Sequence, residues 1–375
     1  MLLVLGHHVV AIYLNASQRL GPQQLPMDWA KVAPLDPLIP WALDMAFGVP
    51  LFCVISGFVL TIPFARRLLA GKSMPSLKLY FLRRLIRLEP PYVFSALVGF
   101  ALILAPFHPL WWARMMFHIF IGHLLATIVY LHALIYGTPS WVNGVGWTLE
   151  TEVQFYLVLP LLALIFLLHR PLPRRLLLAA ATLAAGLFQQ FVLGAPESSK
   201  PALTLLALLS FFLAGMLLAD LHLAPPRWLQ FTKPVGDGLA LLFALLIVLT
   251  IHKNIWWAWP EPFLIAGFTF CLLRSGLVGP LFASRPMTIL GTISYTEYLY
   301  HMFILARLIP HTIRLAPQGH ALWLDCGVQY LLSLAVVLPL CALLYLIAER
   351  PFVEWSHSVT RRLRAPQPPA APTPA

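Results

Sequence analysis

Hydrophobic runs of roughly 20 residues, the length that a helix needs to cross the hydrocarbon core of a bilayer, recur along the whole chain. Of the 375 residues, 60% are hydrophobic and only 10% are charged, so no stretch is polar enough to fold as a separate aqueous domain. The sequence therefore predicts an all-α, polytopic membrane helix bundle. We expect one domain over residues 1–364 and a disordered Pro/Ala-rich tail over residues 365–375.

Ten of the apolar runs are predicted to cross the membrane as helices. They cover residues 1–16, 45–64, 92–107, 147–168, 176–194, 201–220, 235–251, 258–273, 288–309 and 323–347. The orientation of the later helices depends on whether a further apolar stretch, 110–136, crosses the membrane. Short cytoplasmic loops carry the excess of Lys and Arg. If 110–136 crosses, the later basic segments lie on the side opposite to the Arg-rich loop 65–91; if it does not cross, they lie on the same side as that loop. We therefore expect 110–136 to be re-entrant or interfacial, in an integral protein of the cell or inner membrane with both termini in the cytoplasm.

The net charge of +11 raises the question of a nucleic-acid partner. The basic residues cluster between apolar runs, where the positive-inside bias accounts for them, so no nucleic-acid binding is expected. The four cysteines are scattered and lack CxxC spacing, which is typical of small core residues and not of a metal site. The sequence has no GxxxxGKS/T, HExxH, GxSxG or GxGxxG motif, so the templates of soluble enzymes do not apply.

Ionisable residues at membrane depth are the first functional candidates, because burying each one costs several kcal/mol. His7 lies about nine residues, or about 14 Å, before the end of its run, which puts it near the bilayer midplane. A satisfied packing histidine is its alternative reading, and His8, about 100° away, is expected to be a bystander. Glu150 and Glu152 lie one turn into their helix on nearly opposite sides. One should face the interior, where it orients a histidine or holds a proton, while helix-dipole or ion-pair contacts account for the other.

Three arginines, Arg83, Arg84 and Arg87, precede Pro90 and Pro91, which are predicted to end a cytoplasmic helix. Arg83 and Arg87 share a helix face at i,i+4 spacing. Contact with lipid headgroups would explain such a basic run beside the membrane. The functional alternative is a phosphate clamp, because guanidinium forks match phosphate oxygens.

Polar residues also gather where a bundle should be apolar. Ser56 lies in the middle of the run PLFCVISGF, where small residues indicate close helix packing or a cavity. Four further polar residues share one predicted helix near the end of the chain, and so dense a polar face predicts a lined cavity, although some of its tyrosines fit an interfacial aromatic belt. The residues expected to line the substrate cavity are Ser56, Glu150, Ser294, Tyr295, Tyr298 and His301.

Five of these stretches, in the order in which they occur, resemble motifs of the membrane-bound acyltransferase-3 family. They are LLVLGH, which ends at His7, then PLFCVISGF, RRLIRLEPPY, WTLETEVQFYLVLP and SYTEYLYH, and they span nearly the whole chain. The resemblance implies an acyltransferase that moves an acyl group, commonly acetyl, from cytoplasmic acyl-CoA to a hydroxyl of a carbohydrate or other acceptor. No metal is expected.

The resemblance also implies roles for single residues. His7 corresponds to the essential histidine of the family's first helix, and Glu152 to the glutamate of its WSLxxE motif, so both are expected to be catalytic. The three arginines would hold the phosphates of CoA, and Tyr298 and His301 match the late motif. General-base catalysis by His7 and a covalent acyl-histidine both fit this assignment.

One element of the family pattern has no counterpart here. The family's Arg, eleven residues before the first-helix histidine, would fall about five residues before Met1. We therefore expect either a start upstream of Met1 or a truncated and impaired copy.

Two other functions stay open from the sequence. A transporter or flippase of a glycan or lipid-linked substrate would use the polar helices to line its path. A metal or haem protein would draw its ligands from the histidines His7, His118, His123, His132 and His301.

Overall fold

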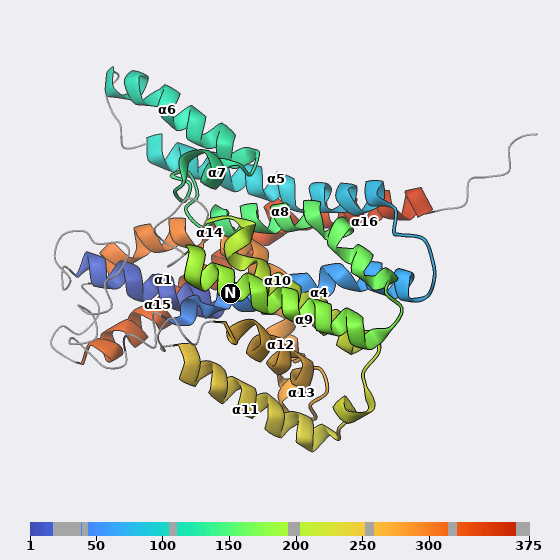
Figure 1. The fold of residues 1–375 in the computed structure, drawn as a ribbon. Coiled ribbons are helices and arrows are strands. Elements are labelled where there is room, and N and C mark those ends of the chain that lie inside the picture. The colour runs from blue at the N-terminus through green and yellow to red at the C-terminus, as the bar shows by residue number, and fades with distance from the viewer. Residues whose placement is uncertain are drawn as a thin grey trace, which may run out of the picture.

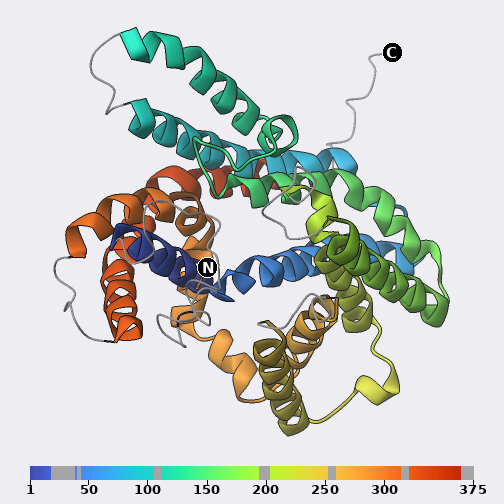
Figure 2. The same cartoon turned by 60° about the vertical axis from the view of Figure 1, so that its left-hand side comes forward.

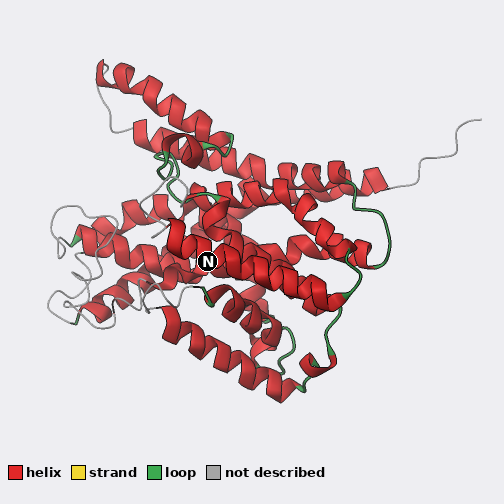
Figure 3. Cartoon of the chain, in the orientation of Figure 1, coloured by secondary structure: helices red, strands yellow, loops and turns green. Residues whose placement is uncertain are grey.

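The computed structural model of the chain describes residues 1–17, 39, 44–104, 111–193, 203–251, 259–313 and 321–364. Within these ranges every regular element is a helix, and loops and turns connect them (Figure 3). The predicted all-α fold is therefore confirmed. The tail 365–375, for which disorder is predicted, lies outside the described residues.

The α-helices follow one another along the chain as labelled in Figure 1. They are α1 (Leu2–Ala16), α4 (Gly48–Leu69), α5 (Leu77–Leu104), α6 (Trp111–Ile128), α7 (His132–Tyr136), α8 (Gly146–Leu162), α9 (Pro171–Phe188), α10 (Leu205–Leu223), α11 (Lys233–Ile251), α12 (Glu261–Leu272), α13 (Val278–Phe282), α14 (Arg285–Thr312), α15 (Leu322–Leu344) and α16 (Arg350–Arg364). Short 3-10 helices cover Asp44–Phe47, Ala163–Leu167 and Arg227–Leu229, and π-helices extend α9 over Gln189–Leu193 and α15 over Tyr345–Glu349.

Seven helical segments in the described part of the chain are long and apolar enough to cross a membrane. They are Met45–Leu69, Leu77–Leu102, Gly146–Leu167, Pro171–Leu193, Leu205–Leu223, Lys233–Thr250 and Leu322–Arg361. Three shorter apolar helices, Leu2–Ala16, Phe117–Ile128 and Glu261–Leu272, accompany them. The predicted span 288–309 forms part of α14, which is not among the seven because its polar residues keep it less apolar. The polytopic helix bundle is confirmed.

The prediction that Pro90 and Pro91 end a helix is wrong, because α5 continues through both. Each proline removes a backbone N–H donor and would normally break a helix. Inside a bundle, neighbouring side chains can provide partners for the freed carbonyl groups. The prolines free the carbonyls of Ile86 and Arg87, one turn earlier, and the hydroxyl of Tyr295 adds a hydrogen bond to the next carbonyl oxygen, that of Leu88, at 2.9 Å. One helix therefore carries the arginines and the adjoining apolar run.

The stretch 110–136 does not form one continuous helix. α6 packs against α5 and ends at Ile128, the chain turns, and the five-residue helix α7 leads toward α8 (Figure 1). Tyr130 in this turn has a φ of 59°, the only positive φ of a non-glycine residue in the described part. That the stretch is re-entrant or interfacial stays a prediction.

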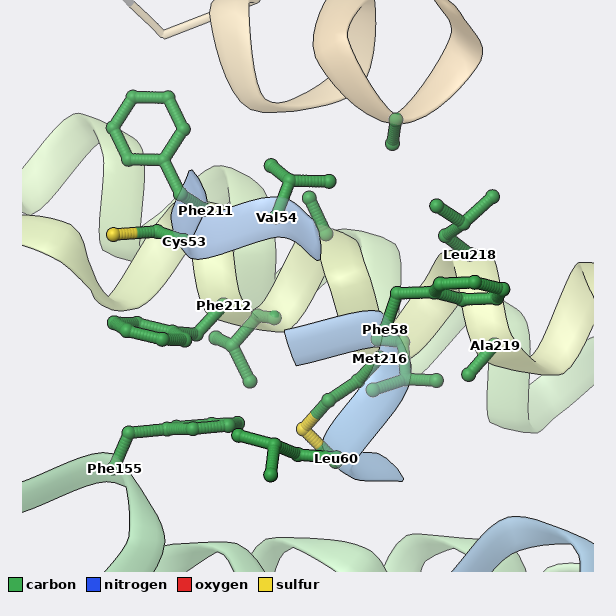
Figure 4. Packing of buried hydrophobic residues seen from close by; sticks show 14 of the residues in the cluster. Cys53, Val54, Phe58, Leu60, Phe155, Phe211, Phe212, Met216, Leu218 and Ala219 are labelled. Atoms are coloured by element: carbon green, nitrogen blue, oxygen red, sulfur yellow. The ribbon is translucent and has the colours of Figure 1, made fainter. Parts of the chain in front are cut away.

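Two large buried apolar clusters hold most of the bundle together, and a small third one, of Ala96, Leu124 and Val142, joins α5, α6 and the segment before α8. The first joins α4, α8, α10 and α12, and Figure 4 shows the side chains of α4 and α10 interlocking within it. A Cβ on Gly57 would overlap the carbonyl oxygen of Phe212, and one on Gly215 would overlap that of Val54. Only glycine therefore allows α4 and α10 to approach this closely, as small residues do in membrane helix pairs.

The second apolar cluster joins α1, α14 and α15, which lie side by side in Figure 2. It also includes Tyr92 of α5 and Leu149 of α8, while Phe155 and Leu159 of α8 belong to the first cluster. Tyr295 packs against both. The first turns of α8, with their polar residues, therefore lie between the two clusters.

Candidate active site

Three histidines from two helices form a row of contacting rings. The ring centroids of His7 and His8 on α1 are 5.0 Å apart, and those of His8 and His301 on α14 are 5.1 Å apart. His301 is fully buried, whereas His7 and His8 are half-buried. The structure thus brings together two histidines predicted for the site, and it places His8 between them.

The hydrogen bonds of His301 define its tautomer. Its Nδ1 lies 2.9 Å from the carbonyl oxygen of Glu297 and 3.0 Å from that of Tyr298. Carbonyl oxygens only accept, so Nδ1 carries the proton and a neutral ring leaves a lone pair on Nε2. That Nε2 atom is buried and has no hydrogen-bond partner among the described residues. His301 therefore presents an unused base nitrogen inside the bundle.

The polar side chains predicted to share one face of α14 contact different neighbouring segments. The hydroxyl of Tyr298 hydrogen bonds to Thr148 and to the carbonyl oxygen of Val145, at the start of α8. The hydroxyl of Tyr295 donates to α5, as described above, whereas Ser294 donates to Gly291 of its own helix at 2.7 Å. Tyr298, whose ring centroid lies 6.4 Å from that of His301, joins the histidine row, while Ser294 does not.

Glu152 lies at a junction of three helices. Ser56 of α4 donates to Glu152 Oε1 at 2.9 Å, and Tyr156, one turn later on α8, also hydrogen bonds to this carboxylate. Arg84 of α5 lies over the Tyr156 ring, 5.3 Å from its centroid, and is within electrostatic range of Glu152. These contacts link Glu152 to the arginines. That Glu152 orients His7 stays a prediction.

The three arginines do not all face the same way. Arg83 Nε donates to Thr360 on α16 at 2.9 Å, and Ser356 of α16 donates to the Arg83 carbonyl oxygen at 3.4 Å. Arg87 is exposed and within electrostatic range of Glu152 and of the buried Glu349. Arg84 and Arg87 thus face the Glu152 junction, whereas the Arg83 side chain contacts the C-terminal helix.

Glu150 and Glu152 contact different helices, in agreement with their opposite positions around α8. Glu150 Oε2 accepts from the backbone N–H of Ala133 at 2.9 Å, and the carboxylate also hydrogen bonds to the backbone N–H of His132. It therefore caps the N-terminus of the neighbouring helix α7. The predicted interaction with the dipole of its own helix, α8, is not the contact that the structure shows. The second oxygen of Glu150, Oε1, is buried and has no partner among the described residues.

Sequence reasoning missed Tyr92. Its side chain is fully buried, and its ring stacks on that of Tyr130 with centroids 4.7 Å apart and planes 11° apart. Tyr130 in turn hydrogen bonds to Glu89. The sequence feature that could have identified Tyr92 is the motif RRLIRLEPPY, which ends in this tyrosine.

Two of the remaining histidines form a pair in the α6–α7 segment. His132 Nδ1 donates to the carbonyl oxygen of Thr138 at 3.0 Å, so its Nε2 accepts from His123 Nδ1 at 2.7 Å. The His123 ring stacks between those of Tyr136 and Trp141, each with a centroid distance of 4.1 Å. Across the residues that the structure describes, no group of three or more His, Cys, Asp or Glu side chains could hold a metal ion.

Comparison with known proteins identifies a family for this chain. A family model described as an acyltransferase domain, that of the acyltransferase-3 family, matches residues 1–346. The comparisons found no matching curated protein and no matching solved structure. The matched range includes the histidine row, the Glu152 junction and all three arginines. The chain therefore belongs to the acyltransferase-3 family and is a membrane acyltransferase.

Proposed function

We propose that this enzyme transfers an acyl group, in the first instance acetyl, from cytoplasmic acyl-CoA to a hydroxyl of a carbohydrate or similar acceptor. O-acetylation of a polysaccharide in the cell or inner membrane would be such a reaction. The observation that carries the proposal is the row of His7, His8 and His301 inside the bundle of a membrane acyltransferase.

The donor end of the site is proposed at the arginines. Arg84 and Arg87 occupy the N-terminal part of α5, and guanidinium groups can bind the phosphates of CoA through paired hydrogen bonds. Further basic residues lie where α4 meets α5, namely Arg66 and Arg67 at the end of α4, Lys72 in the loop and Lys78 at the start of α5, which supports a cytoplasmic position for this end and for both termini. Glu152, held by Ser56, is within electrostatic range of both Arg84 and Arg87.

The reaction needs a base for the acceptor hydroxyl. Neutral imidazole is suited to this work near neutral pH, and His7 is the proposed base. As His7 removes the hydroxyl proton, the oxygen attacks the thioester carbonyl and a C–O bond forms. The C–S bond then breaks, and the departing thiolate takes up the proton from the imidazolium, which releases CoA. In a two-step variant His7 itself attacks first and carries the acyl group before the acceptor does.

The test measures release of free CoA from acetyl-CoA by membranes that contain the protein. The acceptor probe is surface glycan from the host cells after alkaline removal of its ester-linked acyl groups. We expect CoA release to depend on the glycan and His7→Gln to reduce it by about 100-fold or more, the usual contribution of a general base. His118→Gln, on the exposed side of α6, serves as the matched control.

Two results would contradict the proposal. Full transfer by His7→Gln would exclude both the general-base route and the acyl-histidine route. Movement of glycan across the membrane without loss of acetyl-CoA would instead support the transporter alternative.

A further inference from the structure

Two buried oxygen atoms near the start of α8 lack a hydrogen-bond partner among the described residues. They are Oε1 of Glu150 and the hydroxyl oxygen of Tyr92, and both side chains are fully buried. Buried polar groups are almost always hydrogen bonded, because burial without a partner is unfavourable. Two such atoms in one region therefore need an explanation.

The two oxygens belong to the same region. A Cβ built on Gly146 would lie 3.0 Å from the Tyr92 hydroxyl oxygen, so that hydroxyl points at the first turn of α8. Glu150 follows Gly146 at i,i+4 and shares its helix face. Glu150 and Tyr298 are both within electrostatic range of Tyr92. The site thus draws on α5, α8 and α14.

Both groups are held in place from outside this region. Glu150 is anchored through its other oxygen, which accepts from Ala133 N–H at 2.9 Å. The Tyr92 ring is covered by the stacked ring of Tyr130, whose φ of 59° is unfavourable for a residue with a side chain. Such backbone strain persists where the surroundings impose it, and it is concentrated at functional sites. The arrangement is therefore preorganised.

The chemistry of the two atoms selects the ligand. A carboxylate oxygen accepts a hydrogen bond, while a phenol can donate one, so a single alcohol hydroxyl can donate to Glu150 and accept from Tyr92. A phosphate or carboxylate would be repelled by Glu150. The rings of Tyr92, Tyr130 and Tyr298 supply apolar faces against which the carbon skeleton of a sugar can pack.

We propose that Glu150, Tyr92 and Tyr298 form the subsite that binds the acceptor, a neutral polyhydroxy compound such as a sugar. This inference rests on the proposed function. The ring of Tyr298 also approaches His301, so a sugar bound here lies at the His301 end of the histidine row. Glu150 and Tyr92 bind and orient the acceptor, and the base remains a histidine.

The test compares Tyr92→Phe and Glu150→Gln with the wild type. Acetyl-CoA is the donor, and de-esterified surface glycan of the host cells is the acceptor at varied concentration. We expect KM for the glycan to rise about 3- to 10-fold in each variant, the effect of losing one hydrogen bond. KM for acetyl-CoA should not change. Tyr300→Phe is the matched control, because the Tyr300 hydroxyl is also buried and has no partner in the described ranges, but it lies near Cys341 and Glu349.

The outcomes separate this inference from the proposed function. If the wild type transfers acetyl and both variants keep its KM for the glycan, the subsite is refuted while the function stands, and water then satisfies the two oxygens. If the wild type transfers nothing, the proposed function fails. Thermal unfolding of each variant in detergent identifies loss of folding. Should Glu150→Gln melt early because α7 loses its cap, Tyr92→Phe decides, since it removes one oxygen atom and keeps the stacked ring.

Discussion

The ring of His8 lies 5.1 Å from the ring of His301, and this contact joins the first helix of the chain to the polar helix α14. The two residues come from opposite halves of the sequence. The sequence predicts His8 to be a bystander of His7, because the two point in different directions from one helix. The contact instead makes His8 the link between His7 and His301.

His8 is therefore predicted to be a positioning residue. We expect His8→Phe, which keeps a ring and removes both nitrogens, to lower kcat by about 10- to 100-fold, because small displacements of catalytic groups are costly. KM for acetyl-CoA should be unaffected, and the pH profile of kcat should shift. The same substitution at the exposed His118 is the control. An unchanged kcat and pH profile would return His8 to the role of bystander.

The arginines are predicted to differ in their effect on the donor. Arg84→Gln should raise KM for acetyl-CoA by roughly 10- to 100-fold, since a hydrogen bond to a charged group is worth about 1.5–3 kcal/mol. Arg83→Gln should have a much smaller effect, because Arg83 Nε already donates to Thr360. Lys72→Gln in the exposed loop before α5 is the control. Equal effects of the two arginine substitutions would show that both contact CoA.

Close approach of α4 and α10 predicts a sharp difference between two glycines. Gly57→Ala should reduce stability by about 1–3 kcal/mol, the usual cost of overpacking, because the new methyl group overlaps the Phe212 carbonyl. Gly291→Ala on α14 has no atom within 4 Å of the new methyl and should be neutral or slightly stabilising. Melting temperatures in detergent compare the two. A Gly57→Ala protein as stable as the wild type would disprove this close packing.

His132 predicts a pH dependence of stability. Burial lowers the pKa of His132 to about 4, below its usual value of 6.5. Between these two values the unfolded chain binds a proton that the folded protein does not, so stability falls as the pH drops from about 6.5 to 4. Melting temperatures measured across this range should therefore decline, and His132→Gln should reduce the decline. His118→Gln should leave the slope as in the wild type, and an unchanged slope in His132→Gln would refute the prediction.

Much of the fold could be predicted from local patterns. Five predicted spans match observed helices to within a few residues at each end. These helices are α1, α8 with the 3-10 helix that follows it, α10, α11 and α12. The prediction that Pro90 and Pro91 end a helix failed for a physical reason: the rule that proline breaks a helix describes a helix without neighbours. In the bundle, Tyr295 from a distant segment provides a hydrogen bond to the disturbed region of α5.

Prediction of the site was less complete. The motifs pointed to His7, His301, Glu152 and the arginines, but they carried no information on which of these side chains meet. Glu152 was expected near His7, and its described contacts run to Ser56 and Tyr156. Such pairings depend on long-range packing, which sequence spacing does not encode.

By itself the sequence determined that this chain is a membrane helix bundle, because the length and apolar character of a run decide whether a helix can lie in a bilayer. Its five ordered motifs carried the resemblance to the acyltransferase-3 family. Tertiary structure alone decided how the polar residues are grouped. It placed His8 between His7 and His301 and turned Arg83 toward α16. It also set in one region two oxygens, of Tyr92 and Glu150, that have no partner within the described part of the chain. The physical reason is that helix packing, including the close contact at Gly57, sets which faces meet.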